Sequence, residues 1–244
     1  MIYLVLGCHK SGTTLVAEIL HRSGIPMIEG DVGETDYDRG DFFERLDWVY
    51  LNQDILGFGD PAETFSAPTK VSASDAQRRS IVEYVETCQK AHEDWGFKDP
   101  RMCLAYPIWR EHLPEHVPIG VYRSLSEVWA HQARQGRRIR SLWKAVRMWC
   151  DYNWRLADIL ERRRQLGQPY LLLKFEDLMT GDEELGRLEA FLDRPIVDPR
   201  RAGRYRSRSR GRRLLGIVDA VMDACGLANP SLIEYRLESL RRSE

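Results

Sequence analysis

The chain has 244 residues, a formal net charge of −1 and 43% hydrophobic residues. Its length suits one sizeable α/β domain, and the near-zero net charge argues against a general nucleic-acid binder. No apolar run approaches the ~18 residues that span a bilayer, and the apolar stretch from Ile2 to Leu6 is too short for a secretory signal. We therefore expect a cytoplasmic protein that does not engage a membrane.

Cysteine and histidine usage agrees with that location. The five cysteines are scattered, odd in number and without C-x-x-C spacing, so they predict reduced thiols rather than a disulfide framework or a zinc site. The six histidines form no metal-spaced cluster either. The sequence therefore predicts no bound metal.

The first segment of the chain predicts a strand, a loop and a helix. The apolar run from Ile2 to Gly7 predicts a buried strand, Lys10 to Gly12 lie in the loop, and apolar periodicity from Leu15 to Leu20 predicts a helix. This geometry directs backbone N–H groups and the positive end of a helix dipole at one point. It is typical of an anion site, most often for phosphate.

The position of the lysine separates this loop from a nucleotide-triphosphate P-loop, which reads G-x-x-x-x-G-K-[ST]. Gly7 and Gly12 keep the spacing, but Thr13 occupies the lysine position and the lysine lies earlier, at Lys10. The run Lys10-Ser-Gly-Thr-Thr14 resembles the K-S-G-T-T loop of sulfotransferases that use 3′-phosphoadenosine 5′-phosphosulfate (PAPS). The resemblance implies that the donor is bound by His9, Lys10, Ser11, Gly12, Thr13 and Thr14.

Further helices and strands alternate along the chain. We predict helices over 41–56, 74–92, 102–112, 125–135, 141–165 and 183–192, and strands over 95–98, 117–122 and 170–174. This alternation predicts an α/β fold, a single three-layer domain with a central parallel sheet flanked by helices. The resemblance implies that the domain is P-loop NTPase-like. It would span residues 1–244, with a basic loop and C-terminal helices over 199–244.

An acidic stretch, from Glu29 to Asp47, follows the first helix and carries eight carboxylates against two arginines. It is either the mouth of a site for a cationic acceptor or a solubilising surface. Within it, Arg39-Gly-Asp-Phe-Phe-Glu44 resembles a G-x-F-E segment of bacterial sulfotransferases. That resemblance implies that Glu44 is the general base that takes the proton of the acceptor. The alternative is a carboxylate that stabilises the start of a helix.

The run Trp95-Gly-Phe-Lys-Asp-Pro-Arg101 resembles a W-G-x-K-D-P-R segment of bacterial sulfotransferases. The resemblance implies that this strand lies beside the loop strand and that Lys98 points at the transferring group. Lys10 and Lys98 would then spread the charge that builds on the bridging oxygen. Asp99 also fits a plain turn residue, and Arg101 either binds nucleotide or closes the turn.

A second strand end carries an arginine, in Gly120-Val-Tyr-Arg123. In sulfotransferases such an arginine holds the 3′-phosphate of the nucleotide, and a guanidinium grips phosphate at two points. The family's serine eight residues later is His131 here. The second contact therefore stays open between His131, Ser124 and Ser126. The alternative for Arg123 is a simple ion pair with Glu127.

The C-terminal part offers two weaker signals. Leu172 to Leu178 resembles the Y-E-D-L segment of the family, which we interpret as a strand end with a capping carboxylate. Eight arginines lie between Arg200 and Arg213, before two predicted short helices. This run either folds over the 3′-phosphate or is a solvated basic segment.

The leading hypothesis is a PAPS-dependent sulfotransferase of secondary metabolism. It would move a sulfuryl group to a hydroxyl or amine of a small molecule by metal-free in-line transfer, leaving adenosine 3′,5′-bisphosphate. One alternative is a P-loop kinase or NTPase, weakened by the displaced lysine and by the lack of an apolar strand that ends directly in a metal-binding aspartate. The other is a polyanion-binding module built on the arginine run, which leaves Lys98 and Arg123 unexplained.

Overall fold

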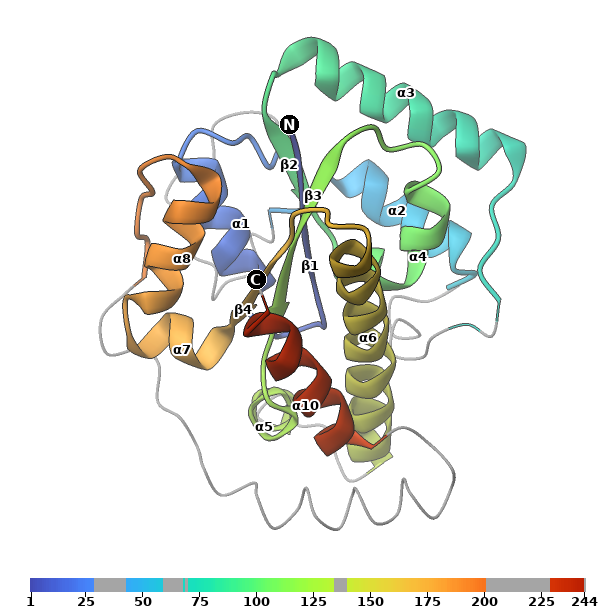
Figure 1. Cartoon of the computed structure of the whole chain (residues 1–244). Coiled ribbons are helices and arrows are strands. Elements are labelled where there is room, and N and C mark those ends of the chain that lie inside the picture. The colour runs from blue at the N-terminus through green and yellow to red at the C-terminus, as the bar shows by residue number, and fades with distance from the viewer. Residues whose placement is uncertain (29–42, 59–67, 69, 134–139, 201–228, 244) are drawn as a thin grey trace.

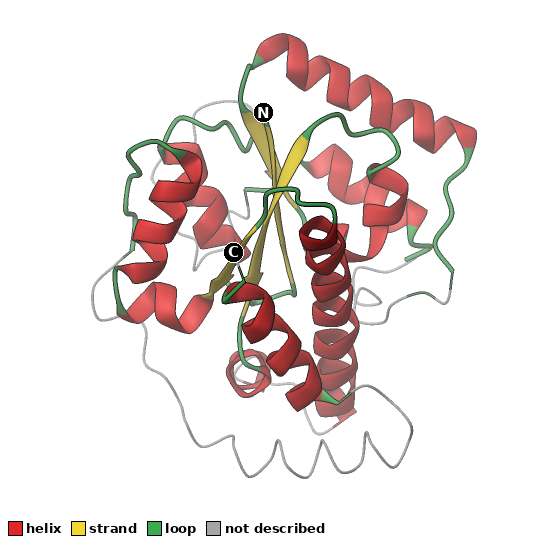
Figure 2. Ribbon diagram, in the orientation of Figure 1, coloured by secondary structure: helices red, strands yellow, loops and turns green. Residues whose placement is uncertain are grey.

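A four-stranded parallel sheet forms the centre of the protein. The computed structural model describes residues 1–28, 43–58, 68, 70–133, 140–200 and 229–243. The strands are β1 (Ile2–Gly7), β2 (Trp95–Lys98), β3 (His116–Tyr122) and β4 (Leu171–Lys174), in the spatial order β2-β1-β3-β4. Figure 2 shows them in yellow at the centre of the molecule, between the red helices. All three neighbouring pairs are parallel.

Helices cover both faces of this sheet (Figure 1). One face carries α1 (Thr13–Arg22), α7 (Phe175–Thr180) and α8 (Glu183–Leu192). The other carries α2 (Leu46–Ile55), α3 (Asp75–Ala91), α4 (Met102–Trp109), α5 (Leu125–Ala133), α6 (Arg140–Gln165) and α10 (Pro230–Arg241). Side chains alternate along a strand. In β1, Tyr3 and Val5 therefore enter one apolar core, while Leu4 and Leu6 enter the other.

The strand order creates a switch point at the carboxyl end of β1. The chain leaves β1 and returns on one side as β2 and later on the other side as β3. In open parallel sheets, ligands bind in the crevice outside such a switch point. Val5 pairs with Lys98 and Gly7 pairs with Val121. The register therefore brings the ends of three strands to the loop that follows β1.

The predicted α/β architecture, with a central parallel sheet between layers of helices, is confirmed. The predicted helix after Ser74 is also confirmed, because the Ser74 side chain and Gln77 form a reciprocal capping box at its start. Among the described residues, no helix has both the length and the apolar character needed to cross a membrane.

Three element predictions need correction. The helix predicted from residue 41 begins only at Leu46, because the described residues before it are not helical. The helix predicted to residue 112 ends at Trp109. The segment from Leu172 to Leu178, interpreted as a strand end, is the end of β4 only as far as Lys174 and continues directly as the short helix α7. The arginines after Arg200 lie outside the described residues, so α10 is the described part of the predicted C-terminal helices.

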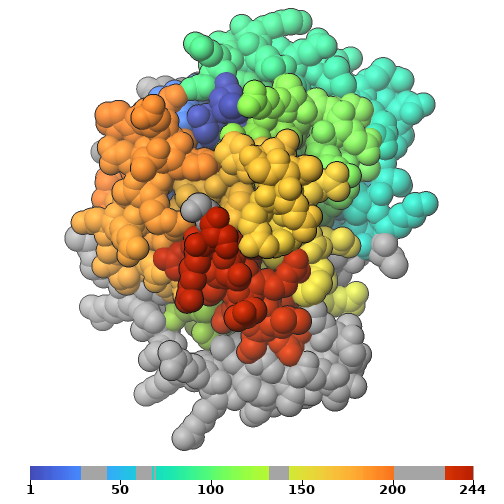
Figure 3. Space-filling model, in the orientation of Figure 1, coloured from blue at the N-terminus to red at the C-terminus, as the bar shows by residue number. Residues whose placement is uncertain are grey.

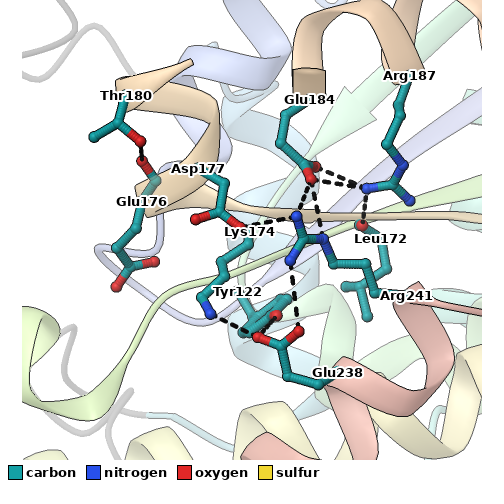
Figure 4. Close-up of polar contacts among 10 residues, drawn as sticks. All are labelled: Tyr122, Leu172, Lys174, Glu176, Asp177, Thr180, Glu184, Arg187, Glu238 and Arg241. Atoms are coloured by element: carbon teal, nitrogen blue, oxygen red, sulfur yellow. Dashed lines mark hydrogen bonds and ion pairs between the residues drawn. The ribbon is translucent and has the colours of Figure 1, made fainter. Parts of the chain in front are cut away.

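Helix α10 packs on α6 and β4 and lies at the surface, in red in Figure 3. Charged side chains also join it to β4, α7 and α8 (Figure 4). Arg241 pairs with the fully buried Glu184, which also accepts two hydrogen bonds of 2.9 Å from Arg187. Glu238 accepts hydrogen bonds of 2.6 Å from Tyr122 and from Lys174. The C-terminal helix is thereby joined to the carboxyl ends of β3 and β4.

Candidate functional site

The loop after β1 has the backbone of an anion cradle. Lys10 and Gly12 adopt left-handed φ angles of 68° and 97°, and the hydroxyl and amide of Ser11 both donate to the carbonyl of Cys8, at 2.6 and 3.1 Å. Helix α1 starts at Thr13 with Gly12 as its N-cap. The first N–H groups of a helix have no partner within it and carry the positive end of its dipole. Ser11 thus shapes the loop, and the Lys10 side chain is exposed.

Lys98, at the carboxyl end of β2, forms a buried ion pair with Glu44. Its ammonium donates to the Glu44 carboxylate at 2.6 Å, and the two side chains are 1% and 14% exposed. Burial raises the pKa of Glu44 above its ordinary value of 4.5 and lowers the pKa of Lys98 below 10.5, although the charge of each partner opposes the change. A carboxylate and an ammonium with displaced pKa values therefore lie in contact beside the loop.

The segment that carries Glu44 is fixed by its preceding residue. Phe43 is 3% exposed, packs into the core beside β1 and α1, and its ring lies 5.5 Å from that of His21. Its φ of 48° lies in the left-handed region, which disfavours a bulky side chain. Such backbone strain is typical of functional sites. Glu44 lies one residue before Arg45, the N-cap of α2, so its predicted alternative role, a carboxylate that stabilises the start of a helix, stays a prediction.

Sequence reasoning missed a chain of buried hydrogen bonds behind this pair. Trp109 donates to Asn52 at 2.7 Å, and Asn52 donates to Asp99 at 2.8 Å. The other oxygen of Asp99 accepts from the guanidinium of Arg101 at 2.5 Å and from its amide at 3.0 Å. That guanidinium lies 4.0 Å from Glu44. Asp99 therefore closes the turn after β2 and also holds Arg101 toward Glu44.

Arg123 follows β3 directly and lies on the other side of the loop. Its guanidinium donates to the carbonyl of Lys10 at 3.4 Å, pairs with Glu127 at 3.2 Å, and lies 4.7 Å above the ring of Phe175. The predicted ion pair with Glu127 therefore forms, and the contact of Arg123 with a 3′-phosphate stays a prediction.

The three candidates for a second phosphate contact differ in position. Ser124 and Ser126 lie beside Arg123 at the start of α5, with their hydroxyls 3.3 Å apart. The amide of Ser124 donates to Glu176 of α7 at 2.9 Å, so the capping carboxylate predicted in that segment serves α5. His131 lies in the last turn of α5. Its contact with the nucleotide stays a prediction.

His9, in the loop itself, is neutral at physiological pH. Burial, with Arg101, Lys98 and Lys10 nearby, lowers its pKa to about 3. Its ring packs edge-on against Tyr152 of α6, with 5.4 Å between centroids. His9 therefore contributes a neutral imidazole beside the lysines, not a further cation.

Arg200, the first arginine of the basic run, has a structural role. It bonds the carboxylates of Asp182 and Asp198 and the carbonyls of Leu178 and Gly181. These contacts attach the start of the run to α7 and α8. Arg201, Arg204, Arg206, Arg208, Arg210, Arg212 and Arg213 lie outside the described residues. In the part of the chain that the structure describes, no group of three or more His, Cys, Asp or Glu could hold a metal ion.

Comparisons with known proteins identify the fold. No protein-family model matches the sequence, and no curated protein matches it either. Among solved structures, the chain is similar to the sulfotransferase domain of the Synechococcus PCC 7002 olefin synthase, with a TM-score of 0.52 and 15% identity over 99% of this chain and 93% of that one. It is also similar to a sulfotransferase domain from the curacin biosynthetic pathway, with a TM-score of 0.50 and 16% identity over 80% of this chain and 74% of that one. The chain thus has the fold of sulfotransferase domains.

Proposed function

We propose that this protein is a PAPS-dependent sulfotransferase that transfers a sulfuryl group to a hydroxyl or amine of a small molecule. One observation carries the proposal. Three cationic side chains, Lys10, Lys98 and Arg123, follow or end three adjacent parallel strands and surround the N-terminus of α1. The fold of the sulfotransferase domains described above supports the same reaction class.

The residues present fit a phosphosulfate donor. The left-handed backbone at Lys10 and Gly12 opens the loop toward the start of α1, where helix N–H groups suit an oxyanion. In the proposal Lys10 and the loop amides hold the 5′ end of the nucleotide, and Arg123 holds its 3′-phosphate. The donor supplies a sulfuryl group on a phosphate leaving group.

In the proposed reaction Glu44 accepts the proton of the acceptor, and Lys98 stabilises the negative charge that develops on the donor. Glu44 takes the proton from the acceptor while the oxygen or nitrogen of the acceptor bonds to sulfur. The bond between sulfur and the bridging oxygen of the donor breaks at the same time. Lys10 and Lys98 neutralise the negative charge that this oxygen gains, and adenosine 3′,5′-bisphosphate leaves. Preorganised cations act strongly where water is excluded, and the Lys98 side chain is only 1% exposed.

Ligand-dependent unfolding tests the donor. Adenosine 3′,5′-bisphosphate should raise the melting temperature, since a ligand at 100 times its Kd adds about 2.7 kcal/mol to the free energy of unfolding. ATP should add far less, with or without Mg²⁺. Stabilisation by ATP–Mg²⁺ alone would overturn the proposal. Transfer of ³⁵S from labelled PAPS to a panel of alcohols, phenols and amines then tests the reaction.

The pH dependence of transfer should be bell-shaped. Activity needs the ionised carboxylate of Glu44, so it falls as pH falls through the raised pKa of that residue. It also needs the ammonium of Lys98, so it falls again as pH rises through the lowered pKa of that residue. We expect the acidic limb above pH 4.5 and the alkaline limb below pH 10.5 in kcat/KM. Replacing Glu44 with glutamine should abolish the acidic limb, and an unchanged limb would exclude it as the base.

The rival kinase or NTPase needs a metal-binding aspartate. Among the described residues, Asp99 follows a strand directly, because it comes after Lys98 at the end of β2. Its two carboxylate oxygens, however, accept hydrogen bonds from Arg101 and Asn52. A carboxylate so engaged and 1% exposed is a poor ligand for a hydrated Mg²⁺. This observation favours the metal-free reaction.

A further inference from the structure

The proposed function makes two demands on one lysine. In the structure the Lys98 ammonium contacts Glu44 at 2.6 Å. In the proposed reaction the same ammonium also stabilises the bridging oxygen of the donor. If the ammonium moves toward the donor, the Glu44 carboxylate loses part of the positive charge beside it. The Glu44 side chain is only 14% exposed, so water does little to replace that charge. Loss of a neighbouring cation in a desolvated site favours the protonated carboxyl, and a protonated Glu44 cannot accept a proton.

Arg101 is placed to compensate for this loss. Its guanidinium lies 4.0 Å from the Glu44 oxygen that Lys98 does not bond. It is 8% exposed, and its Nε has no hydrogen-bond partner among the described residues. A guanidinium stays charged at every accessible pH, so Arg101 can hold the charge of Glu44 while Lys98 turns to the donor.

We propose, building on the proposed function, that Arg101 is the positioning residue that keeps Glu44 ionised during sulfuryl transfer. The buried hydrogen bonds from Trp109 through Asn52 to Asp99 then also fix the position of Arg101, in addition to closing the turn after β2. Asp99 bonds the guanidinium nitrogen Nη1 of Arg101 at 2.5 Å, and this same nitrogen lies 4.0 Å from the Glu44 carboxylate.

Among the residues that the structure describes, no other charged neighbour of Glu44 can replace Arg101 in this role. The charged groups that act on Glu44 are Lys98 and Arg101, which favour its carboxylate, and Asp99, which opposes it. His9 is neutral with a pKa of about 3. Tyr152 is neutral too, because burial raises its pKa well above 10.0. Lys10 is exposed and belongs to the donor loop.

The titration of Glu44 tests this role without any need for turnover. Carbon-13 NMR of the glutamate carboxyls in the full-length protein, assigned with Glu44→Gln, gives its pKa in four forms. These are the wild type, Arg101→Gln, Lys98→Met and the double variant Lys98→Met/Arg101→Gln. Because a cation 4–6 Å away lowers a carboxyl pKa by about 1–3 units, the Arg101→Gln change should raise the pKa of Glu44 by about one unit or more. The rise should be larger in the Lys98→Met background.

Two controls separate charge from structure. Arg101→Lys keeps the charge and should leave the pKa of Glu44 near that of the wild type. Arg163→Met removes another buried arginine, which is 9% exposed and donates to the carbonyl of His116, the first residue of β3 and far from the candidate site. This change should leave the pKa of Glu44 unchanged. If Arg101→Gln does not fold, the double variant Asp99→Asn/Arg101→Gln replaces it, because this variant also removes the carboxylate that Arg101 pairs with. The pKa of Glu44 in this double variant is then compared with its pKa in Asp99→Asn.

The outcomes distinguish the two proposals. If Arg101→Gln leaves the pKa of Glu44 unchanged both relative to wild type and, in the double variant, relative to Lys98→Met, the role of Arg101 is overturned. If that pKa rises as expected while wild type neither binds adenosine 3′,5′-bisphosphate nor transfers sulfate, the proposed function fails and the electrostatic role of Arg101 stands. In an active enzyme, the acidic limb of kcat/KM should move upward with Arg101→Gln and return with Arg101→Lys.

Discussion

Replacing Lys98 with methionine should lower kcat about 10²- to 10³-fold, the loss typical of removing one preorganised donor at a developing oxyanion. Methionine fills a similar volume, but removing one partner of a buried ion pair lowers the free energy of unfolding by about 3–5 kcal/mol. Glu44 keeps Arg101 at 4.0 Å, and kcat is compared at a temperature at which the variant is still folded. Affinity for adenosine 3′,5′-bisphosphate, measured by calorimetry, should change far less than kcat, because the charge that Lys98 stabilises develops in the transition state.

Lys174 offers a matched control. It also ends a strand, β4, and also donates to a glutamate at 2.6 Å, but its partner is Glu238 of α10 and its side chain is 29% exposed. Lys174→Met should reduce stability by about 1 kcal/mol or less, as half-exposed ion pairs do, and leave kcat unchanged. Equal losses of kcat in the two variants would show that Lys98 acts through the fold alone.

The sequence was sufficient to predict the sheet and its loop. Short apolar runs such as Val117 to Tyr122, separated by helix-length periodic segments, leave few topologies other than a parallel sheet between helices. The capping box at Ser74 marked the start of α3 correctly because it is a purely local interaction. Sequence patterns did not predict the start of α2 correctly, because tertiary contacts determine where that helix begins. The segment of Phe43 and Glu44 is held outside α2 by the burial of Phe43 in the core of the other face.

The candidate site was predicted only in part, for the same reason. Motif positions brought Lys98 and Glu44 to attention separately, and the structure adds that they form one ion pair. The buried hydrogen bonds join Trp109 to Asn52, 57 positions apart, and Asn52 to Asp99, 47 positions apart. Sequence motifs do not predict contacts between residues so far apart. Asn52 carried one usable signal, since a polar residue on the apolar side of an amphipathic helix predicts a buried hydrogen bond.

The second large effect should come from Gly12. An alanine there must adopt a φ of 97°, and its Cβ would come within 2.0 Å of the Phe175 ring. The left-handed backbone costs an alanine about 1–2 kcal/mol, and forcing a methyl into a filled space costs about 1–3 kcal/mol more. We expect Gly12→Ala to lower the free energy of unfolding by about 2–5 kcal/mol. Denaturation with urea measures this change.

Gly24 separates the two causes. Its φ of 87° is similar, but no atom lies within 4 Å of the position a Cβ would take. Gly24→Ala should therefore show the backbone cost alone. The remaining loss in Gly12→Ala should shrink when Phe175 is also replaced by leucine. Because Arg123 lies over the Phe175 ring, displacing that ring should also weaken binding of adenosine 3′,5′-bisphosphate. Equal destabilisation by the two glycine substitutions would show that Phe175 does not press on the loop.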